Sequence, residues 1–470
     1  MIFNSFIFWA FFALVLLLYW RLPPAGQNRL LLLASYVFYG YWDWRYLGLI
    51  ATSTLLDYCI GRSLLGLQEA RQRKMLVTLS IVINLSILGF FKYYGFFVTE
   101  FAELLRAIGF EAHLPILQIV LPVGISFYTF QSMAYVIDLY RGVTKPARSL
   151  IDYALFVSYF PQLLAGPIER SSKLLPQIQG ERRYRPGDFA EGLYHILIGL
   201  FKKVIVADNL APIANRVFET PAADLSGTEM LIGVYAFAFQ IYGDFSGYSS
   251  MAQGVSKWLG IDLSYNFRMP YFSRSPSEFW QRWHISLSQW LRDYLYIPLG
   301  GNRHGPTRTQ VNLLLTMLLG GLWHGANWTF IAWGAWHGLL LIAYRVAGTE
   351  RFERPAPSTA VAVIEALAMF HFVCVGWIFF RAASVEQAFG MFGALGNGFA
   401  ITDFAVYASS LLAFFVTPLL VYEWYVYRQR DMVLALSQPA WQRVLLYGYF
   451  VAMVAIFPPL AQQVFIYFQF

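Results

Sequence analysis

Apolar residues in this sequence gather into long runs, separated by short polar stretches. A membrane-spanning helix needs about 20 apolar residues, and about eleven runs approach or exceed that length. Two runs, 30–56 and 310–345, are too long for one straight span, so we expect a break or a helix pair in each. The pattern predicts an all-α integral membrane protein with about eleven transmembrane helices. The runs are approximately 2–20, 30–56, 75–98, 115–139, 150–168, 190–207, 229–250, 310–345, 360–380, 404–427 and 444–468.

Composition supports the same fold class. Of the 470 residues, 58% are hydrophobic, 19% aromatic and 13% charged, whereas soluble domains carry about 25% charged residues. A soluble chain this apolar would expose large hydrophobic patches to water, and an excess of Tyr and Trp suits the two interfaces of a lipid bilayer. Because no linker, low-complexity stretch or repeat divides the sequence, we expect a single polytopic membrane domain over residues 1–470.

Basic residues predict how the chain is oriented. The net charge of +7 is spread over short clusters between apolar runs, a pattern typical of topology control, and no separate basic domain points to nucleic acid. No Lys or Arg precedes Arg21, so the basic region of a cleaved signal peptide is missing. The positive-inside rule then predicts an external N-terminus. The predicted cytoplasmic clusters are Arg21 and Arg29; Arg62, Arg71, Arg73 and Lys74; and Arg141, Lys145 and Arg148.

Cysteine and histidine spacing gives no metal or disulfide signal. The two cysteines, Cys59 and Cys374, lie far apart within apolar runs, where each is expected to be a small buried hydrophobe. Histidines at i and i+4, the spacing that pairs zinc ligands on a helix, are absent. No metal site is expected.

Two stretches do not read as ordinary spans. From Phe160 to Arg170 the sequence carries two prolines and a glycine, which break a helix. Such irregular backbone is tolerated at membrane depth only where protein or a wet cavity covers it. The second stretch runs from Ser273 to Arg303, and within it a helix start at Ser275 combines a capping residue, a proline at the first helical position and an acidic residue three positions on.

Within this stretch, Ser275 to Tyr296 is predicted to form one amphipathic helix that lies at the membrane interface or wraps a membrane cavity. Trp283, Leu287, Trp290 and Tyr294 recur at intervals of four, three and four, which places them on one helical face. His284 stands beside Trp283. It is either an interfacial histidine that binds a lipid headgroup or a backbone carbonyl, or a functional residue.

The run from 313 to 341 contains no Asp, Glu, Lys or Arg, yet it holds His324 and His337. An ionisable group at that depth is unfavourable and usually functional. Three glycines near His324 weaken the helix but allow backbone or ligand to approach closely. At 100° per residue the two histidines face nearly opposite sides of one continuous helix, so they share a site only if the helix breaks. We expect a functional His324, and a structural role for His337 and for His371.

These motifs resemble those of the membrane-bound O-acyltransferase family, and within it the alginate O-acetyltransferase branch. The resemblance covers essentially the whole chain, and its most specific part is Trp-His-Ile-Ser-Leu-Ser followed some forty residues later by Leu-Trp-His-Gly-Ala-Asn. It implies a helical bundle around a tunnel through the bilayer, with interfacial and re-entrant helices, and acyl transfer to a hydroxyl. The matching segments are 121–128, 160–167, 244–249, 278–288, 290–303 and 320–338.

By this resemblance His324 takes the position of the membrane-embedded catalytic histidine, and His284 that of the second polar residue. Other branches place Asn there, whereas a histidine is typical of members that acylate extracytoplasmic polymers. The segment 168–173 departs from the alginate enzymes, which leaves the particular polymer open.

The resemblance also implies a donor, a partner and a location. A tunnel with a histidine at its middle lets a cytoplasmic thioester, acetyl-CoA, meet a hydroxyl from outside. No cofactor is expected to be tightly bound. We expect a bacterial inner-membrane enzyme that works with a separate extracytoplasmic acetyltransferase. Two alternatives stay open: transfer of D-alanyl groups to teichoic acid, and a transporter or flippase without covalent chemistry, for which Asp244 is the candidate membrane carboxylate.

The last residues, 465–470, read Phe-Ile-Tyr-Phe-Gln-Phe. An aromatic anchor at the membrane interface is one interpretation. The other follows from the resemblance, because related systems carry the same F-x-Y-x-x-F pattern: Tyr467 would be an acyl relay. A phenol has a pKa near 10, so a histidine activates it more easily than an aliphatic hydroxyl.

Overall fold

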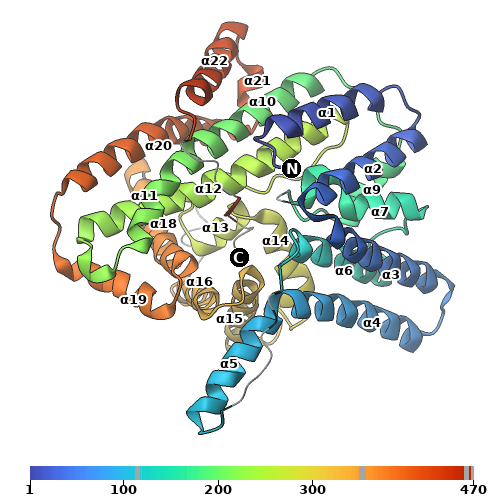
Figure 1. The fold of residues 1–470 in the computed structure, drawn as a ribbon, viewed down its shortest axis with the longest axis horizontal. Coiled ribbons are helices and arrows are strands. Elements are labelled where there is room, and N and C mark those ends of the chain that lie inside the picture. The colour runs from blue at the N-terminus through green and yellow to red at the C-terminus, as the bar shows by residue number, and fades with distance from the viewer. Residues whose placement is uncertain (112–116, 118, 165, 349–355, 460–464, 467–470) are drawn as a thin grey trace. The chain divides into compact units, whose positions relative to one another are not determined.

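The computed structural model describes the chain except for residues 112–116, 118, 165, 349–355, 460–464 and 467–470. The described residues form helices and contain no strand, as the apolar pattern predicts (Figure 1). They group into two compact units. Unit 1 comprises Met1–Gly192 with Val255–Ser264, and unit 2 comprises Leu193–Gly254 with Tyr265–Phe470. The helices α10 (Asp188–Leu200) and α12 (Gly227–Trp258) run from one unit into the other.

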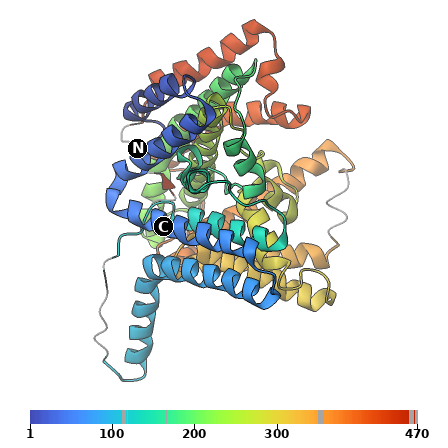
Figure 2. The same ribbon diagram turned by 90° about the vertical axis from the view of Figure 1, so that its right-hand side faces the viewer.

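Unit 1 is built on helices whose aromatic faces pack together. Phe8 stacks on Phe12 with ring centroids 5.9 Å apart, and Phe38 and Phe160 bring α2 and α8 against the same cluster. Figures 1 and 2 show α5 turning sharply away from the axis of α4, at the π-helical segment η2 (Gly89–Tyr93). The helices are α1 (Phe6–Tyr19), α2 (Pro24–Asp43), η1 (Trp44–Tyr46), α3 (Leu47–Gly66), α4 (Ala70–Leu88), α5 (Tyr94–Ala107), α6 (Ile125–Arg141), α7 (Leu150–Ser158), α8 (Phe160–Leu163) and α9 (Ser171–Gln179).

Both predicted breaks in this unit are confirmed. The long run 30–56 divides into α2 and α3 at the short 3-10 turn η1. The run 150–168 divides at Tyr159 into α7 and the short helix α8, and the described residues between α8 and α9 form no helix. The carboxylate of Glu169 is buried there and accepts hydrogen bonds from the backbone amide and hydroxyl of Ser264, which close this irregular segment.

Unit 2 contains the remaining elements. They are η3 (Phe201–Ala207, π-helical), α11 (Asp208–Glu219), η4 (Ala222–Asp224), η5 (Pro270–Phe272), α13 (Pro276–Arg282), α14 (Ile285–Leu291), η6 (Arg292–Tyr296, π-helical), α15 (Gly305–His324), α16 (Trp328–Val346), α18 (Thr359–Arg381), α19 (Val385–Ala394), η7 (Leu395–Asn397), α20 (Asp403–Gln429), α21 (Leu434–Ser437) and α22 (Ala440–Ile456). The predicted helix pair in 310–345 is confirmed as α15 and α16.

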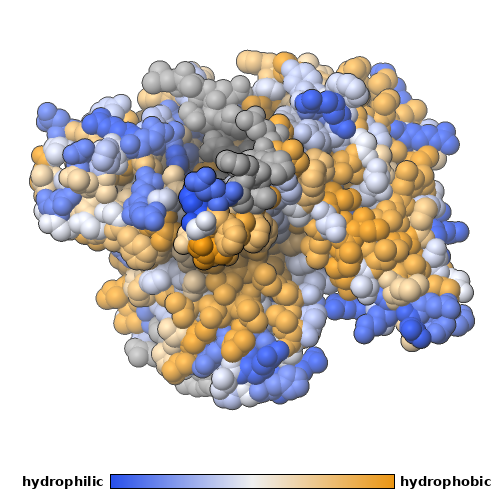
Figure 3. All heavy atoms as spheres, turned by 60° about the horizontal axis from the view of Figure 1, so that its bottom comes forward, coloured by the Kyte–Doolittle hydropathy of each residue, from blue (hydrophilic) through white to orange (hydrophobic). Residues whose placement is uncertain are grey.

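The surface carries the apolar character expected of a membrane protein. Ala70–Ala107, Thr359–Arg381 and Asp403–Gln429 are long and apolar enough to cross a bilayer. Large hydrophobic side chains are exposed on several helices, among them Phe6, Ile364 and Val444. Figure 3 shows broad hydrophobic areas with hydrophilic residues gathered along their margins. The total of about eleven spans, the external N-terminus and the single domain over 1–470 stay predictions.

Two expectations were wrong. The run 444–468 is not one span, because α22 ends at Ile456 and Pro458 and Pro459 follow, where the second proline cannot continue a helix. Cys59 is exposed, whereas Cys374 is buried as expected. A helix face that meets lipid is as apolar as one that meets the core, so position within an apolar run does not decide burial.

Candidate functional site

His324 is the last residue of α15 and lies at a sharp helix-to-helix turn. Gly325 is extended, and the side chain of Asn327 caps α16 by accepting a hydrogen bond from the amide of Thr329 at 2.9 Å. The imidazole is 3% exposed. Its ring centroid lies 4.9 Å from that of Trp333 and 5.3 Å from that of Phe380. The helix break therefore places His324 in a buried aromatic pocket rather than on a helix face.

The glycines near His324 serve the packing of α15 against α16. A Cβ on Gly321 would lie 2.1 Å from the carbonyl oxygen of Phe330, and one on Gly334 would lie 2.3 Å from that of Met317. Neither contact is possible for a real side chain, so the two backbones touch here. Of the two uses that the sequence leaves open for the three glycines near His324, close approach of backbone is observed at Gly321.

The stretch Ser275 to Tyr296 is not one continuous helix, which corrects the sequence prediction. Its start is as predicted, because Ser275 accepts a hydrogen bond from the amide of Glu278 at 3.2 Å. The helix then ends at Arg282, and His284 takes left-handed backbone angles of φ 42° and ψ 54° before α14 begins. A non-glycine residue seldom adopts this conformation, so neighbouring contacts must hold it.

Asn266 supplies those contacts. Its side-chain oxygen lies 3.3 Å from Nδ1 of His284 and accepts hydrogen bonds from the amide and hydroxyl of Ser286, at 3.2 Å and 2.9 Å. Its backbone carbonyl accepts from the amide of Ile285 at 2.9 Å. His284 is 0% exposed, so it is not an interfacial histidine that reaches a headgroup. Burial lowers the pKa of His284 to about 3, because the imidazolium would lose its hydration; the ring is therefore neutral near pH 7.

Trp323 joins the two histidines. Its ring centroid lies 5.0 Å from that of His324 and 6.1 Å from that of His284. On its other side His284 meets the edge of Phe245, a residue of α12, at 4.7 Å between centroids. The structure thus brings both predicted histidines to one buried aromatic cluster. Asn266, Trp323 and Phe245 were not predicted as site residues, since no local pattern marks a clamp that acts across eighteen positions.

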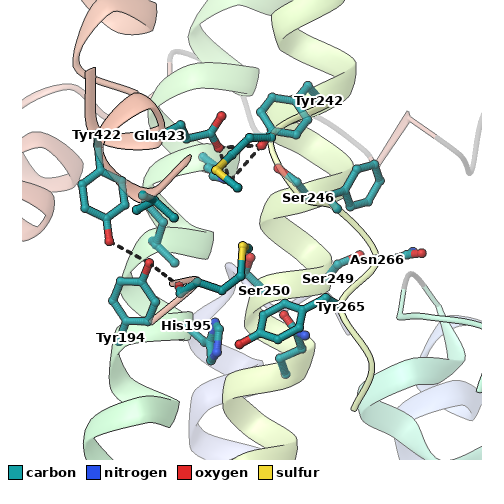
Figure 4. A pocket seen from close by; sticks show the side chains of 17 residues that line it. Tyr194, His195, Tyr242, Ser246, Ser249, Ser250, Tyr265, Asn266, Tyr422 and Glu423 are labelled. Carbon is teal, nitrogen blue, oxygen red and sulfur yellow. Dashed lines mark hydrogen bonds and ion pairs between the residues drawn. The ribbon is translucent and has the colours of Figure 1, made fainter. Parts of the chain in front are cut away.

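A small cavity lined in part by Asn266 borders the clamp (Figure 4). It holds about 40 Å³, room for roughly three water molecules at ~10–15 Å³ each. Polar groups from α10, α12 and α20 face it, and two hydrogen bonds cross it: Tyr194 to Tyr422 at 2.7 Å, and Tyr242 to Glu423 at 2.5 Å.

The remaining histidines differ from this pair. His337 is fully buried, and its ring lies 4.8 Å from Trp333 and 5.2 Å from Trp280. His371 lies on the surface of α18 and shares a hydrogen bond with the hydroxyl of Tyr235 at 2.8 Å. Neither environment contradicts a structural role. The described residues contain no cluster of three His, Cys, Asp or Glu side chains that could hold a metal ion.

Tyr467 lies outside the described residues. The two residues before it are described: Phe465 is 0% and Ile466 3% exposed, and both contact α12. For these two residues the interpretation as an anchor at the membrane surface is wrong, because both are buried in contact with α12.

The chain belongs to the membrane-bound O-acyltransferase family, whose model matches residues 36–386. This range contains His284 and His324 but not the last residues. The protein is therefore an O-acyltransferase and an integral membrane protein embedded in a lipid bilayer.

Its relatives place it among the O-acetyltransferases of the family. The chain is 45% identical to the probable alginate O-acetylase of Azotobacter vinelandii over 84% of its own length and 78% of that protein. It is 37% identical to the peptidoglycan O-acetyltransferase of Helicobacter pylori, over 88% and 83% of the two chains. The teichoic acid D-alanyltransferase of Streptococcus thermophilus is 31% identical over 47% of this chain and 55% of its own.

Proposed function

We propose that this protein passes acetyl groups from cytoplasmic acetyl-CoA across the bacterial inner membrane for O-acetylation of an extracytoplasmic polysaccharide. The observation that carries the proposal is the convergence of His284 and His324 on Trp323, within one buried cluster. Relatives named for alginate and for peptidoglycan acetylation support an acetyl group and a polymer acceptor.

His324 acts as the general base. A neutral imidazole takes the proton of the attacking hydroxyl, and the resulting oxygen nucleophile forms a C–O bond at the thioester carbonyl. The C–S bond breaks, and the leaving thiolate takes the proton from the imidazolium and departs as a free thiol. His284, neutral and held by Asn266, orients or polarises the donor carbonyl.

The first acceptor in this proposal is the phenol of Tyr467. Its acetyl ester keeps much of the transfer potential of a thioester, which a sugar ester would not. A separate extracytoplasmic acetyltransferase then takes the acetyl group, the phenol is restored, and the acetyl group passes to a polymer hydroxyl. The donor binds as a substrate, and no cofactor is tightly held.

D-alanyl transfer to teichoic acid is the second candidate reaction. The D-alanyltransferase relatives match about half of the chain, whereas the acetyltransferase relatives match more than four fifths of it. The candidate membrane carboxylate of the transporter alternative, Asp244, is ion-paired with Lys203 at 2.6 Å.

The test is acyl transfer by purified protein in lipid vesicles supplied with radiolabelled acetyl-CoA. We expect label on a peptide containing Tyr467 in the unmodified protein and none in Tyr467→Phe, which removes only the hydroxyl. Tyr449→Phe, a change on α22, should retain the label and serves as the matched control. Undiminished labelling in Tyr467→Phe would overturn the relay, and labelling only from D-alanyl-loaded carrier protein would overturn the acetyl donor.

A further inference from the structure

A buried ion cluster lies beneath the C-terminal segment. The Lys203 ammonium contacts the carboxylates of Asp208 at 2.7 Å and Asp244 at 2.6 Å, and the three side chains are 1%, 1% and 4% exposed. One ammonium therefore faces two buried carboxylates. A buried carboxylate is stable only when hydrogen-bond donors complete its surroundings.

The C-terminal segment donates a further hydrogen bond to this cluster. The backbone amide of Ile466 donates to Oδ2 of Asp244 at 2.7 Å, while Oδ1 of the same carboxylate faces Lys203. Beside this bond the Phe465 ring packs against Tyr248 and Phe245, with centroids 4.6 Å and 5.7 Å apart. The segment is thus bound twice, through a backbone amide and through an aromatic ring.

This binding point lies close to the proposed reaction centre. Phe245 touches Phe465 on one side and His284 on another, at 5.7 Å and 4.7 Å between ring centroids. Tyr467 is the next residue after Ile466, and neighbouring Cα atoms are about 3.8 Å apart. The docked Ile466 is therefore the covalent neighbour of the proposed relay residue.

We infer that Asp244, held in place by Lys203, is a positioning residue that docks the C-terminal segment and so presents Tyr467 to the histidine pair. The inference rests on the proposed relay for its catalytic part, although docking can be measured without it. Asp244 accepts a hydrogen bond from the backbone N–H of residue 466, and any residue except proline would provide that N–H. Phe465 supplies the side-chain selectivity.

Docking is tested by photo-crosslinking in lipid vesicles. Phe465 is replaced with the photoreactive analogue p-benzoylphenylalanine, and adducts with α12 peptides are quantified by mass spectrometry. We expect Asp244→Ala to reduce the adduct about tenfold, the scale of one hydrogen bond to a charged group. Asp244→Asn keeps an acceptor oxygen and should recover part of the yield. Asp208→Asn is the matched control, because Asp208 contacts the same ammonium but not Ile466, and it should leave docking intact.

A variant of the donor residue, Ile466, tests the same hydrogen bond without disturbing the ion cluster. Ile466→Pro removes the donated N–H and leaves Lys203, Asp208 and Asp244 untouched. It should lower the adduct as Asp244→Ala does. Adduct yields unchanged in both variants, or lowered equally by Asp208→Asn, would overturn the docking role of Asp244.

Acetyl labelling of the same variants separates this inference from the relay. If docking and labelling of Tyr467 fall together in Asp244→Ala and partly return in Asp244→Asn, the positioning role is supported. If docking falls while polymer acetylation is unchanged, Asp244 still holds the segment but the relay through Tyr467 is wrong, and with it the catalytic part of the inference.

Discussion

His284 and His324 reach one aromatic cluster from two different kinds of backbone. His324 ends a regular helix, and close packing of α15 on α16 fixes its turn. His284 occupies a left-handed turn between two seven-residue helices, and hydrogen bonds to Asn266 fix it. The comparison teaches that the two halves of the proposed site should fail in different ways. A change that disturbs the packing of α15 on α16 should displace His324. Removal of the single polar side chain of Asn266 should displace His284.

The largest effect should come from His324 itself. His324→Ala should lower acetyl transfer by about 10² to 10⁴-fold, the usual contribution of a general base, while the protein remains inserted and folded. Radiolabel transfer in vesicles measures the loss, and size-exclusion chromatography checks the fold. A well-folded His324→Ala protein with normal transfer would remove the general-base role.

Asn266→Ala tests the hydrogen-bonded half. The change removes the acceptor for His284 Nδ1 and for both groups of Ser286, so the left-handed turn loses its clamp. We expect the rate of acetyl transfer to fall about tenfold, because each buried polar group left without a hydrogen-bond partner destabilises the turn by about 1–3 kcal/mol. Asn266→Asp, which keeps the acceptor, is the companion variant. Equal loss in both would show that something other than acceptance by Asn266 matters.

Gly321→Ala tests the packed half through stability. The added methyl would meet the Phe330 carbonyl, so α15 and α16 must separate. We expect destabilisation of about 1–3 kcal/mol, measured as thermal unfolding in detergent. Gly448→Ala is the control: nothing lies within 4 Å of its new Cβ in α22, and it should be neutral or stabilising. A melting temperature for Gly321→Ala equal to that of the unmodified protein would contradict the packing argument.

The smallest effect is expected at Gln289, which is exposed on α14. Gln289→Cys should leave transfer unchanged and report which side of the membrane the His284 half faces. We expect a membrane-impermeant maleimide to label it from the cytoplasmic side, where the donor enters. Labelling from neither side would contradict an interfacial position for α14.

Local sequence signals predicted those parts of the site that local chemistry controls. The Ser275 cap and the break between α15 and α16 follow from residues within a few positions of each other. The left-handed turn at His284 could not be predicted, because the spacing of Trp283 and Leu287 fits a continuous helix and no glycine or proline marks a break. The contact that stabilises the turn comes from Asn266, eighteen positions earlier.

The C-terminal segment shows the same limit more strongly. Its aromatic pattern suggested an anchor, and the family resemblance suggested a relay. No residue near Ile466 in the sequence indicates that its backbone amide binds a carboxylate. That carboxylate lies 222 positions away on α12. The end of α22 could have been predicted from Pro458 and Pro459, but a span assigned from hydropathy alone does not take prolines into account.

The two adjacent lysines of η3 bear on the order in which the chain can assemble. Lys203 finds one partner, Asp208, five residues later and within the same stretch of chain. Lys202 instead pairs with Glu423 of α20 at 2.7 Å, and that helix leaves the ribosome near the end of synthesis. An unpaired ammonium is expensive to place in a bilayer. The ion pair between Lys202 and Glu423 can therefore form only after almost all of the protein has been made, which makes it a late step of biogenesis.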